Sequence, residues 1–299
     1  MADKTILHML TPLKQMSPFD VNMALDAGFD AVIPYVDVTN DQVNGLVQDA
    51  IFSRPPRLGP KTGIFIAGRN AGQALDWIDE SKKALVPPFG CSVYADPAGS
   101  FTTAAAMVAH VDTMLRKEFN QTLKGLKVAV FGATGVVGYA SGVIAALEGA
   151  HVLLAGHNGA RQVSESAKEM QDRFGVTVEA VDASTEELKG DLLKRVDVAM
   201  TAAKAGVQVI SSLLLKDAPH LLVVADVNAV PPLGVAGLDV NSGRVQLGEK
   251  TIGIGALAIG HTKYRAQFEL FKKMLESDKI VSFDFRDAFH LAREIASAS

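Results

Sequence analysis

Residues 127–138, Lys-Val-Ala-Val-Phe-Gly-Ala-Thr-Gly-Val-Val-Gly, constrain the fold more than any other stretch of the chain. The apolar run at 128–131 has the length of a buried strand, Gly132 ends it, and a helix is predicted over 136–148. A glycine-rich turn between a strand and a helix suits a nucleotide, because it admits a pyrophosphate and the helix N-terminus presents free N–H groups. The alternative is a glycine turn required only for packing the helix on the sheet.

The composition indicates a globular protein of ordinary character. With 299 residues, 48% of them hydrophobic and 21% charged, the chain is long enough for about two domains. The net charge of -4 and the lack of a basic block argue against nucleic acid as a partner. The single cysteine, Cys91, is expected to be a small core residue. Neither a signal peptide nor a membrane span is recognisable, so we expect a cytoplasmic protein that does not contact membranes.

Strand and helix patterns alternate along the chain. Strands are predicted at 5–10, 30–35, 61–67 and 91–95, and then at 127–131, 151–155, 176–181, 196–199 and 221–225. Helices are expected between them, including one that begins at Thr102 or Thr103 and one from His261 onward. This alternation predicts an α/β protein of two domains, the second a doubly wound parallel-sheet domain of the Rossmann type. We place the first domain at 1–118, completed by helices within 270–299, and the second at 119–269.

The end of the second strand of the nucleotide-binding block bears on cofactor choice. An acidic residue there would bond the adenosine ribose and repel a 2′-phosphate, but Gly156, His157 and Asn158 stand at this point. Arg161 follows, either facing a phosphate or lying in the solvated first turn of a helix. NADP is therefore favoured and NAD stays open. The candidate cofactor-binding residues are Gly132, Ala133, Thr134, Gly135, Val136, Val137, Gly138, His157, Asn158, Arg161, Thr201, Ala202, Asp226 and Asn228.

In the first domain, polar residues follow the predicted strands. The segment 96–103 joins a turn to a helix N-terminus, which suits polar or anionic ligand groups. Helix capping is the alternative explanation for Asp96.

Other chemistries lack their motifs. No Gly-Lys-Ser/Thr phosphate loop is present, the histidines form no pair with metal-ligand spacing, and Ser141 does not lie in a Gly-x-Ser-x-Gly elbow. We therefore expect neither nucleotide hydrolysis, a metal site nor hydrolase chemistry.

Several stretches in order along nearly the whole chain resemble the NAD(P)-dependent methylene-tetrahydromethanopterin dehydrogenases of methylotrophic bacteria. They are residues 35–39, 51–54, 99–106, 132–138, 225–234 and 255–260. Members of that family that depend strictly on NADP carry two basic residues just past the second strand. His157 and Asn158 occupy this place here, so the chain resembles the branch that accepts both NAD and NADP.

The resemblance implies hydride transfer from methylene-tetrahydromethanopterin to NAD(P)+, which yields the methenyl form during oxidation of formaldehyde to formate and carbon dioxide. It also implies a cleft between two α/β domains and a homo-oligomer, a trimer or a hexamer. Tetrahydrofolate-linked relatives keep a lysine that matches Lys263, which with Asp20 is a candidate catalytic residue. The candidate substrate-binding residues are Phe19, Tyr35, Asp96, Ser100, Thr102, Thr103 and His261. The alternatives are a methylene-tetrahydrofolate dehydrogenase, with or without cyclohydrolase activity, and a non-enzymatic NAD(P)-sensing protein.

Overall fold

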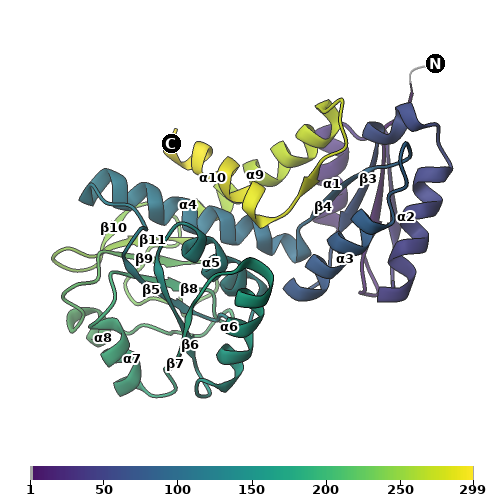
Figure 1. The fold of residues 1–299 in the computed structure, drawn as a ribbon. Coiled ribbons are helices and arrows are strands. Elements are labelled where there is room, and N and C mark those ends of the chain that lie inside the picture. Colours follow the sequence, from purple (N-terminus) through teal and green to yellow (C-terminus); the bar gives the residue numbers. More distant parts are fainter. Residues whose placement is uncertain (1–2, 299) are drawn as a thin grey trace. The chain divides into compact units, whose positions relative to one another are not determined.

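The computed structural model describes residues 3–298 (Figure 1). The chain divides into two compact units. Unit 1 comprises Met1–Thr102 and Tyr264–Ala288, and unit 2 comprises Thr103–Lys263 and Phe289–Ser299. Helices α4 (Ser100–Phe119), α9 (Ala256–Glu276) and α10 (Phe285–Ser297) each begin in one unit and end in the other. The domain limits predicted at residues 118 and 270 lie within α4 and α9.

Unit 1 is built on a parallel sheet with the order β12-β4-β3-β1-β2. Its further elements are β1 (Ile6–Leu10), α1 (Pro18–Ala27), β2 (Ala31–Tyr35), η1 (Asn40–Gln42), α2 (Val43–Phe52), η2 (Pro56–Lys61), β3 (Thr62–Ile66), α3 (Ala71–Lys83), β4 (Ser92–Ala95), η3 (Pro97–Gly99) and β12 (Ser282–Phe283). The direction of winding reverses between β1 and β3, which pair with each other in parallel. The carboxyl ends of strands at such a reversal are where open α/β sheets bind ligands.

Unit 2 has the sheet order β10-β11-β9-β8-β5-β6-β7. Its elements are β5 (Lys127–Phe131), α5 (Val136–Leu147), β6 (His151–Gly156), α6 (Arg161–Phe174), β7 (Glu179–Asp182), α7 (Glu186–Leu193), β8 (Val198–Thr201), α8 (Ser212–Lys216), β9 (Val223–Asp226), β10 (Val245–Gln246) and β11 (Ile252–Ile254). All pairs are parallel except β10 with β11. The reversal falls between β5 and β8, as in the Rossmann order. The predicted α/β class and Rossmann-type domain are confirmed.

Alternation along the strands of unit 2 buries both faces of its sheet. On one face of the sheet, Ala129 and Phe131 of β5 join a core cluster with leucines of α7 and α8. On the opposite face, Leu154 of β6 packs near Gly142 of α5. Figure 1 shows α5 and α6 together on one side of this sheet. Because both faces are covered, ligands have access only at the strand ends.

Some predicted boundaries were wrong. Helix α9 begins at Ala256 rather than at His261, and α4 begins at Ser100 rather than at Thr102 or Thr103. Strand β12, which pairs Ser282 with Val93, was not predicted, because two residues are too few to show a period.

Cys91 is buried, and burial raises the pKa of its thiol to about 12, so it is an inert packing group as predicted. Within residues 3–298, no helix is long and apolar enough to cross a membrane, and no group of His, Cys, Asp and Glu could hold a metal ion.

Candidate active site

The glycines of the turn after β5 have different structural roles. Gly132 has φ 81°, and a Cβ there would lie 2.3 Å from the carbonyl oxygen of Ala202. A Cβ on Gly138 would lie 2.4 Å from the carbonyl oxygen of Gly132. These two glycines are therefore required for packing, which is the alternative raised by the sequence. Gly135 is the N-cap of α5 and has no side chain that could cap it, so the N–H groups of the helix start stay uncovered.

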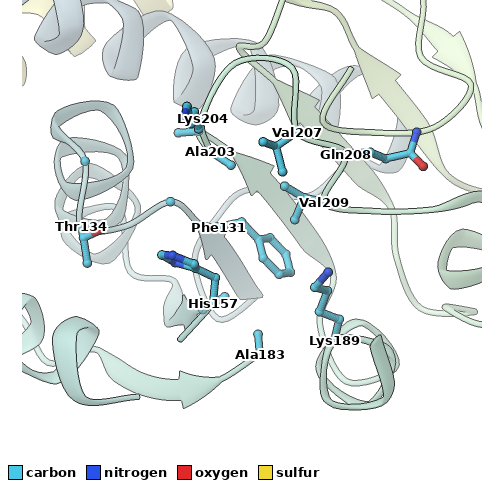
Figure 2. A pocket seen from close by; sticks show the side chains of 14 residues that line it. Phe131, Thr134, His157, Ala183, Lys189, Ala203, Lys204, Val207, Gln208 and Val209 are labelled. Atoms are coloured by element: carbon cyan, nitrogen blue, oxygen red, sulfur yellow. The ribbon is translucent and has the colours of Figure 1, made fainter. Parts of the chain in front are cut away.

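A cavity of about 440 Å³ opens at this turn (Figure 2). It is lined by Phe131, Gly132, Thr134, Gly135, Ala155, His157, Ala183, Lys189, Ala202, Ala203, Lys204, Val207, Gln208 and Val209. These residues come mainly from the ends of β5, β6 and β8, from α7 and from the loop after β8. The cavity therefore lies at the reversal point of the sheet, its size is typical of a small-molecule site, and its floor is apolar.

The charges around this cavity are positive. Lys189 and Lys204 line it, and no described residue in the lining is a carboxylate. Lys189 also pairs with Glu186 of the same helix at 2.5 Å, whereas Lys204 lies on the exposed loop after β8. Such a rim favours a ligand that carries phosphate groups.

Of the predicted cofactor residues, the structure brings Gly132, Thr134, Gly135, His157 and Ala202 to the cavity. Ala133 is buried in the turn, and Val136, Val137 and Gly138 begin α5. The amide of Asn158 lies 3.1 Å from Nε2 of His157. Arg161 begins α6, is almost fully exposed and lies 4.0 Å from Glu165, so it occupies the solvated helical turn that was the alternative for it.

The remaining predicted cofactor residues form a buried network. Asp226, at the end of β9, is 1% exposed. Its Oδ1 accepts hydrogen bonds from the Thr201 hydroxyl (2.6 Å) and the Asn228 N–H (3.0 Å), and its Oδ2 accepts from the Gly234 N–H (2.7 Å). Burial raises the pKa of Asp226, and these hydrogen bonds oppose the rise. This arrangement ties the segment 227–235 to the ends of β8 and β9.

Unit 1 contains a comparable network around Asp96, which follows β4 and is fully buried. Its Oδ1 accepts from the N–H groups of Phe101 and Thr102, and its Oδ2 accepts from the hydroxyls of Thr102 (2.6 Å) and Tyr94 (3.4 Å). The pKa of Tyr94 lies well above its ordinary value, because it is buried and because the Asp96 and Asp20 carboxylates face it. Asp96 thus caps the start of α4, the alternative that the sequence left open, and any contact of Asp96 or Thr102 with substrate stays a prediction.

A second group in unit 1 joins α1 to α9. Asp20 is 2% exposed and accepts a hydrogen bond from the Gln267 amide at 2.8 Å. Next to it, Phe19 meets Tyr264 edge to face, with ring centroids 6.2 Å apart. Phe19 and Tyr264 are 47% and 45% exposed, so a buried carboxylate stands beside an open aromatic surface. Flat aromatic ligands bind to surfaces of this kind.

The other candidate residues lie in different settings. Lys263 is half-buried and precedes Tyr264 in α9, on the face that carries Gln267 one turn later. His261 is exposed on another face of α9. The Tyr35 hydroxyl, at the end of β2, lies 3.1 Å from Nδ1 of His8. The partly buried Ser100 and Thr103 lie in the first turn of α4.

Known proteins of similar sequence supply the family. Residues 18–98 match the family model described as methylene-tetrahydromethanopterin dehydrogenase, N-terminal. An NAD(P)-dependent methylenetetrahydromethanopterin dehydrogenase of Methylorubrum extorquens is 54% identical over 294 residues, 98% of this chain and 99% of the relative. The chain belongs to this dehydrogenase family. A bifunctional protein MdtA of the same organism is 32% identical and covers 94% of the chain and 95% of its own length.

Solved structures of proteins outside the methylene-tetrahydromethanopterin dehydrogenase family share the fold. Shikimate 5-dehydrogenase of Listeria monocytogenes, solved with shikimate and NAD, aligns with a TM-score of 0.53 at 14% identity, over 90% of this chain and 91% of the other. Ornithine carbamoyltransferase of Pyrococcus furiosus aligns with a TM-score of 0.52 at 13% identity, over 90% and 83%. At these identities the likeness concerns architecture alone.

The sequence did not identify three residues of the candidate site in this chain. Tyr264 was assigned to the apolar spacing of a helix, although 45% of it is exposed. Lys204 lies two residues after the predicted Ala202 and three residues past the end of β8, so a strand-end position could have indicated it. Lys189 carries no such signal, because it lies within α7 and reaches the cavity only through the folding of that helix against the sheet.

Proposed function

We propose that this chain transfers a hydride from methylene-tetrahydromethanopterin to NAD(P)+ and releases the methenyl product. The observation that carries the proposal is the 54% identity over 98% of the chain to a relative of that name. The cavity at the reversal point of unit 2 supports it, because its geometry and charge suit a dinucleotide.

The residues present fit a nicotinamide dinucleotide. The uncovered N-terminus of α5 at Gly135 suits the pyrophosphate, and Lys204 supplies a positive charge at the cavity rim. The apolar walls around Phe131, Ala183 and Val209 suit the adenine. The absence of a carboxylate after β6, where His157 lines the cavity, is compatible with both NAD and NADP. When bound, the oxidised nicotinamide ring accepts the hydride.

On the substrate side, we assign Phe19 and Tyr264 to stacking against the pterin. Asp20 places a negative charge in a buried environment, where it stabilises positive charge that develops as the substrate loses hydride. Its hydrogen bond from Gln267 fixes the carboxylate in advance. Lys263 orients the pterin. No base is needed for the hydride step, so the residues act by positioning and by excluding water.

The other parts of the proposal concern the cell and the assembly. We propose that the reaction belongs to formaldehyde oxidation in methylotrophic one-carbon metabolism, and that the protein works in the cytoplasm as a trimer or hexamer. The name of the M. extorquens relative supports the reaction rather than the tetrahydrofolate-linked dehydrogenase or the non-enzymatic sensor.

One assay tests these proposals. The purified protein is mixed with methylene-tetrahydromethanopterin or methylene-tetrahydrofolate, each with NAD or NADP, and the absorbance of the reduced nicotinamide is followed. We expect turnover with the methanopterin substrate and both cofactors. Turnover with the folate substrate alone, or cofactor binding without any turnover, would overturn the proposed function.

A further inference from the structure

Unit 2 contains a second pocket, of about 580 Å³, which shares no lining residue with the dinucleotide cavity. It lies between α4, the start of α9 and the segment before β10, and we call it the α4–α9 pocket. Its lining is His110, Thr113, Met114, Lys117, Glu118, Asn241, Gly243, Arg244, Leu257, Ala258, His261, Thr262 and Ala296. Its volume is within the range of sites for small metabolites.

Two interactions make the walls of this pocket rigid. Arg244 donates two hydrogen bonds to the Glu118 carboxylate, at 2.8 Å and 3.0 Å, which holds the segment before β10 against α4. Nε2 of His110 lies 2.8 Å from the Thr262 hydroxyl and holds α4 against α9. Burial lowers the pKa of His110, a hydrogen bond with the Ala258 backbone opposes this, and the charges of Lys117 and His261 add to the lowering.

The groups left for a ligand are donors and cations. Lys117 is exposed and forms no ion pair within residues 3–298, and Arg244 and His261 add basic side chains to the lining. The Thr113 hydroxyl is the second observation. Thr113 is 7% exposed and lines the pocket, and its Oγ1 has no hydrogen-bond partner among the described residues. That oxygen is itself buried, so a ligand meets the hydroxyl once the Thr113 side chain rotates it toward the pocket. Because a buried hydroxyl without a partner costs roughly 1–3 kcal/mol, a ligand that bonds to it gains that energy.

We propose that the α4–α9 pocket binds a small organic anion. A phosphate or carboxylate group lies between Lys117 and Arg244 and accepts a hydrogen bond from Thr113. The apolar part of the ligand packs on Met114 and Leu257. Arg244 and Glu118 form a nearly neutral pair, so Arg244 offers the anion only its remaining N–H groups, and Lys117 supplies the net positive charge.

The test uses inorganic phosphate as the probe and the full chain as the protein. NAD is added at saturating concentration to keep phosphate out of the dinucleotide cavity, and the imidazole proton signals of His261 are followed by NMR, with His261→Gln to assign them. We expect a saturable shift. Lys117→Ala should weaken phosphate binding roughly fivefold, because it removes a charged hydrogen-bond partner. Lys216→Ala, which removes an exposed lysine from α8, should leave it unchanged.

Thr113→Val separates a ligand contact from a structural role. Valine has nearly the same shape and removes only the hydroxyl that lacks a partner, so the melting temperature should not fall, whereas phosphate binding should weaken about threefold. A non-saturable shift, or equal phosphate affinity in all variants, overturns the proposal. A lower melting temperature for Thr113→Val shows that the hydroxyl serves the fold and also contradicts it.

The anion has two conceivable sources, an acidic group of the pterin substrate or a separate metabolite, and this distinction rests on the proposed function. Steady-state kinetics of Lys117→Ala distinguish them. A raised KM for methylene-tetrahydromethanopterin at unchanged kcat assigns the anion to the substrate, and an unchanged KM assigns it to a separate metabolite. Failure of the dehydrogenase assay itself would leave the phosphate titration as an independent result.

Discussion

Two aspartates at strand ends, one in each unit, accept hydrogen bonds from their neighbours with different geometry. Asp96 and Asp226 are both buried, and each accepts a 2.6 Å hydrogen bond from a threonine hydroxyl. Asp96 directs one oxygen to two backbone N–H groups of the following helix and the other oxygen to two hydroxyls. Asp226 directs both of its oxygens to backbone N–H groups, from Asn228 and from Gly234.

This difference matters because hydroxyls can reverse a hydrogen bond and backbone N–H groups cannot. Around Asp96, the backbone N–H groups of Phe101 and Thr102 both meet one oxygen, so an amide NH₂ in place of the other oxygen could donate to rotated hydroxyls. Around Asp226, each oxygen meets a fixed donor, and an amide NH₂ in either position would oppose an N–H. Two carboxylates with similar burial should therefore respond differently to the same substitution.

The largest expected effect is that of Asp226→Asn on stability. The free energy of unfolding should fall by about 3 kcal/mol, since one backbone N–H loses its acceptor in the interior. Asp96→Asn should lower it by less than about 1 kcal/mol. Urea unfolding of both variants and the wild type measures the two changes. Equal losses would show that the position of the fixed donors does not explain the behaviour of these sites.

A third buried carboxylate, Asp20, extends the comparison to catalysis. Gln267 donates to it from a side-chain amide, so Asp20→Asn can keep that hydrogen bond. The substitution nevertheless removes the negative charge assigned to the developing cation. We expect kcat to fall roughly thirtyfold, which corresponds to about 2 kcal/mol in the activation barrier.

The matched control for Asp20 is Asp26→Asn, which removes an exposed carboxylate from the same helix. Its turnover should equal that of the wild type. If both variants lose turnover equally, the long-range charge of α1 rather than the buried position of Asp20 is responsible.

A smaller effect is expected at Lys204, where unit 2 presents a cation to the dinucleotide cavity. Lys204→Ala should raise the Kd for NADP about fivefold without changing the free energy of unfolding, because the side chain is exposed and does not hold the fold together. Fluorescence titration with NADP measures the affinity, and Lys216→Ala serves as the control. An unchanged Kd would remove Lys204 from the cofactor site.

Local patterns in the sequence predicted local structure well. The turn around Gly132 and most strands of both sheets depend on a few neighbouring residues whose preferences are visible in the chain. The start of α9 was misplaced because Gly255 and Gly260 resemble helix breakers, yet Gly260 lies inside the helix.

The candidate site was predictable only in part, because its members come from distant segments. Thr134 and His157 follow strands that the sequence identified. Asp226 was chosen as a ligand residue on the same reasoning, but its bond to the Gly234 N–H depends on how the segment 227–235 folds back. No periodicity in the sequence predicts that a segment folds back in this way. A strand-end position alone therefore does not distinguish a residue that contacts a ligand from one whose hydrogen bonds hold a loop in place.

The smallest expected effect is a dependence of the Asp226→Asn penalty on pH. Burial raises the pKa of Asp226 above its ordinary 3.8, so the folded state binds this proton more tightly than the unfolded state does. The wild type is therefore stabilised by this group as the pH falls from neutral through the raised value, and the gain is complete below 3.8. A protonated carboxyl tolerates the site better than an amide, because its O–H can donate to Thr201 while the same oxygen accepts from Asn228. The difference in unfolding free energy between wild type and Asp226→Asn should therefore be larger at pH 4.5 than at pH 7.5. Other titrating groups cancel in this difference because both proteins contain them. A penalty that shrinks toward acid would mean that the hydrogen bonds to Asp226 outweigh its burial, and that the pKa lies below its ordinary value.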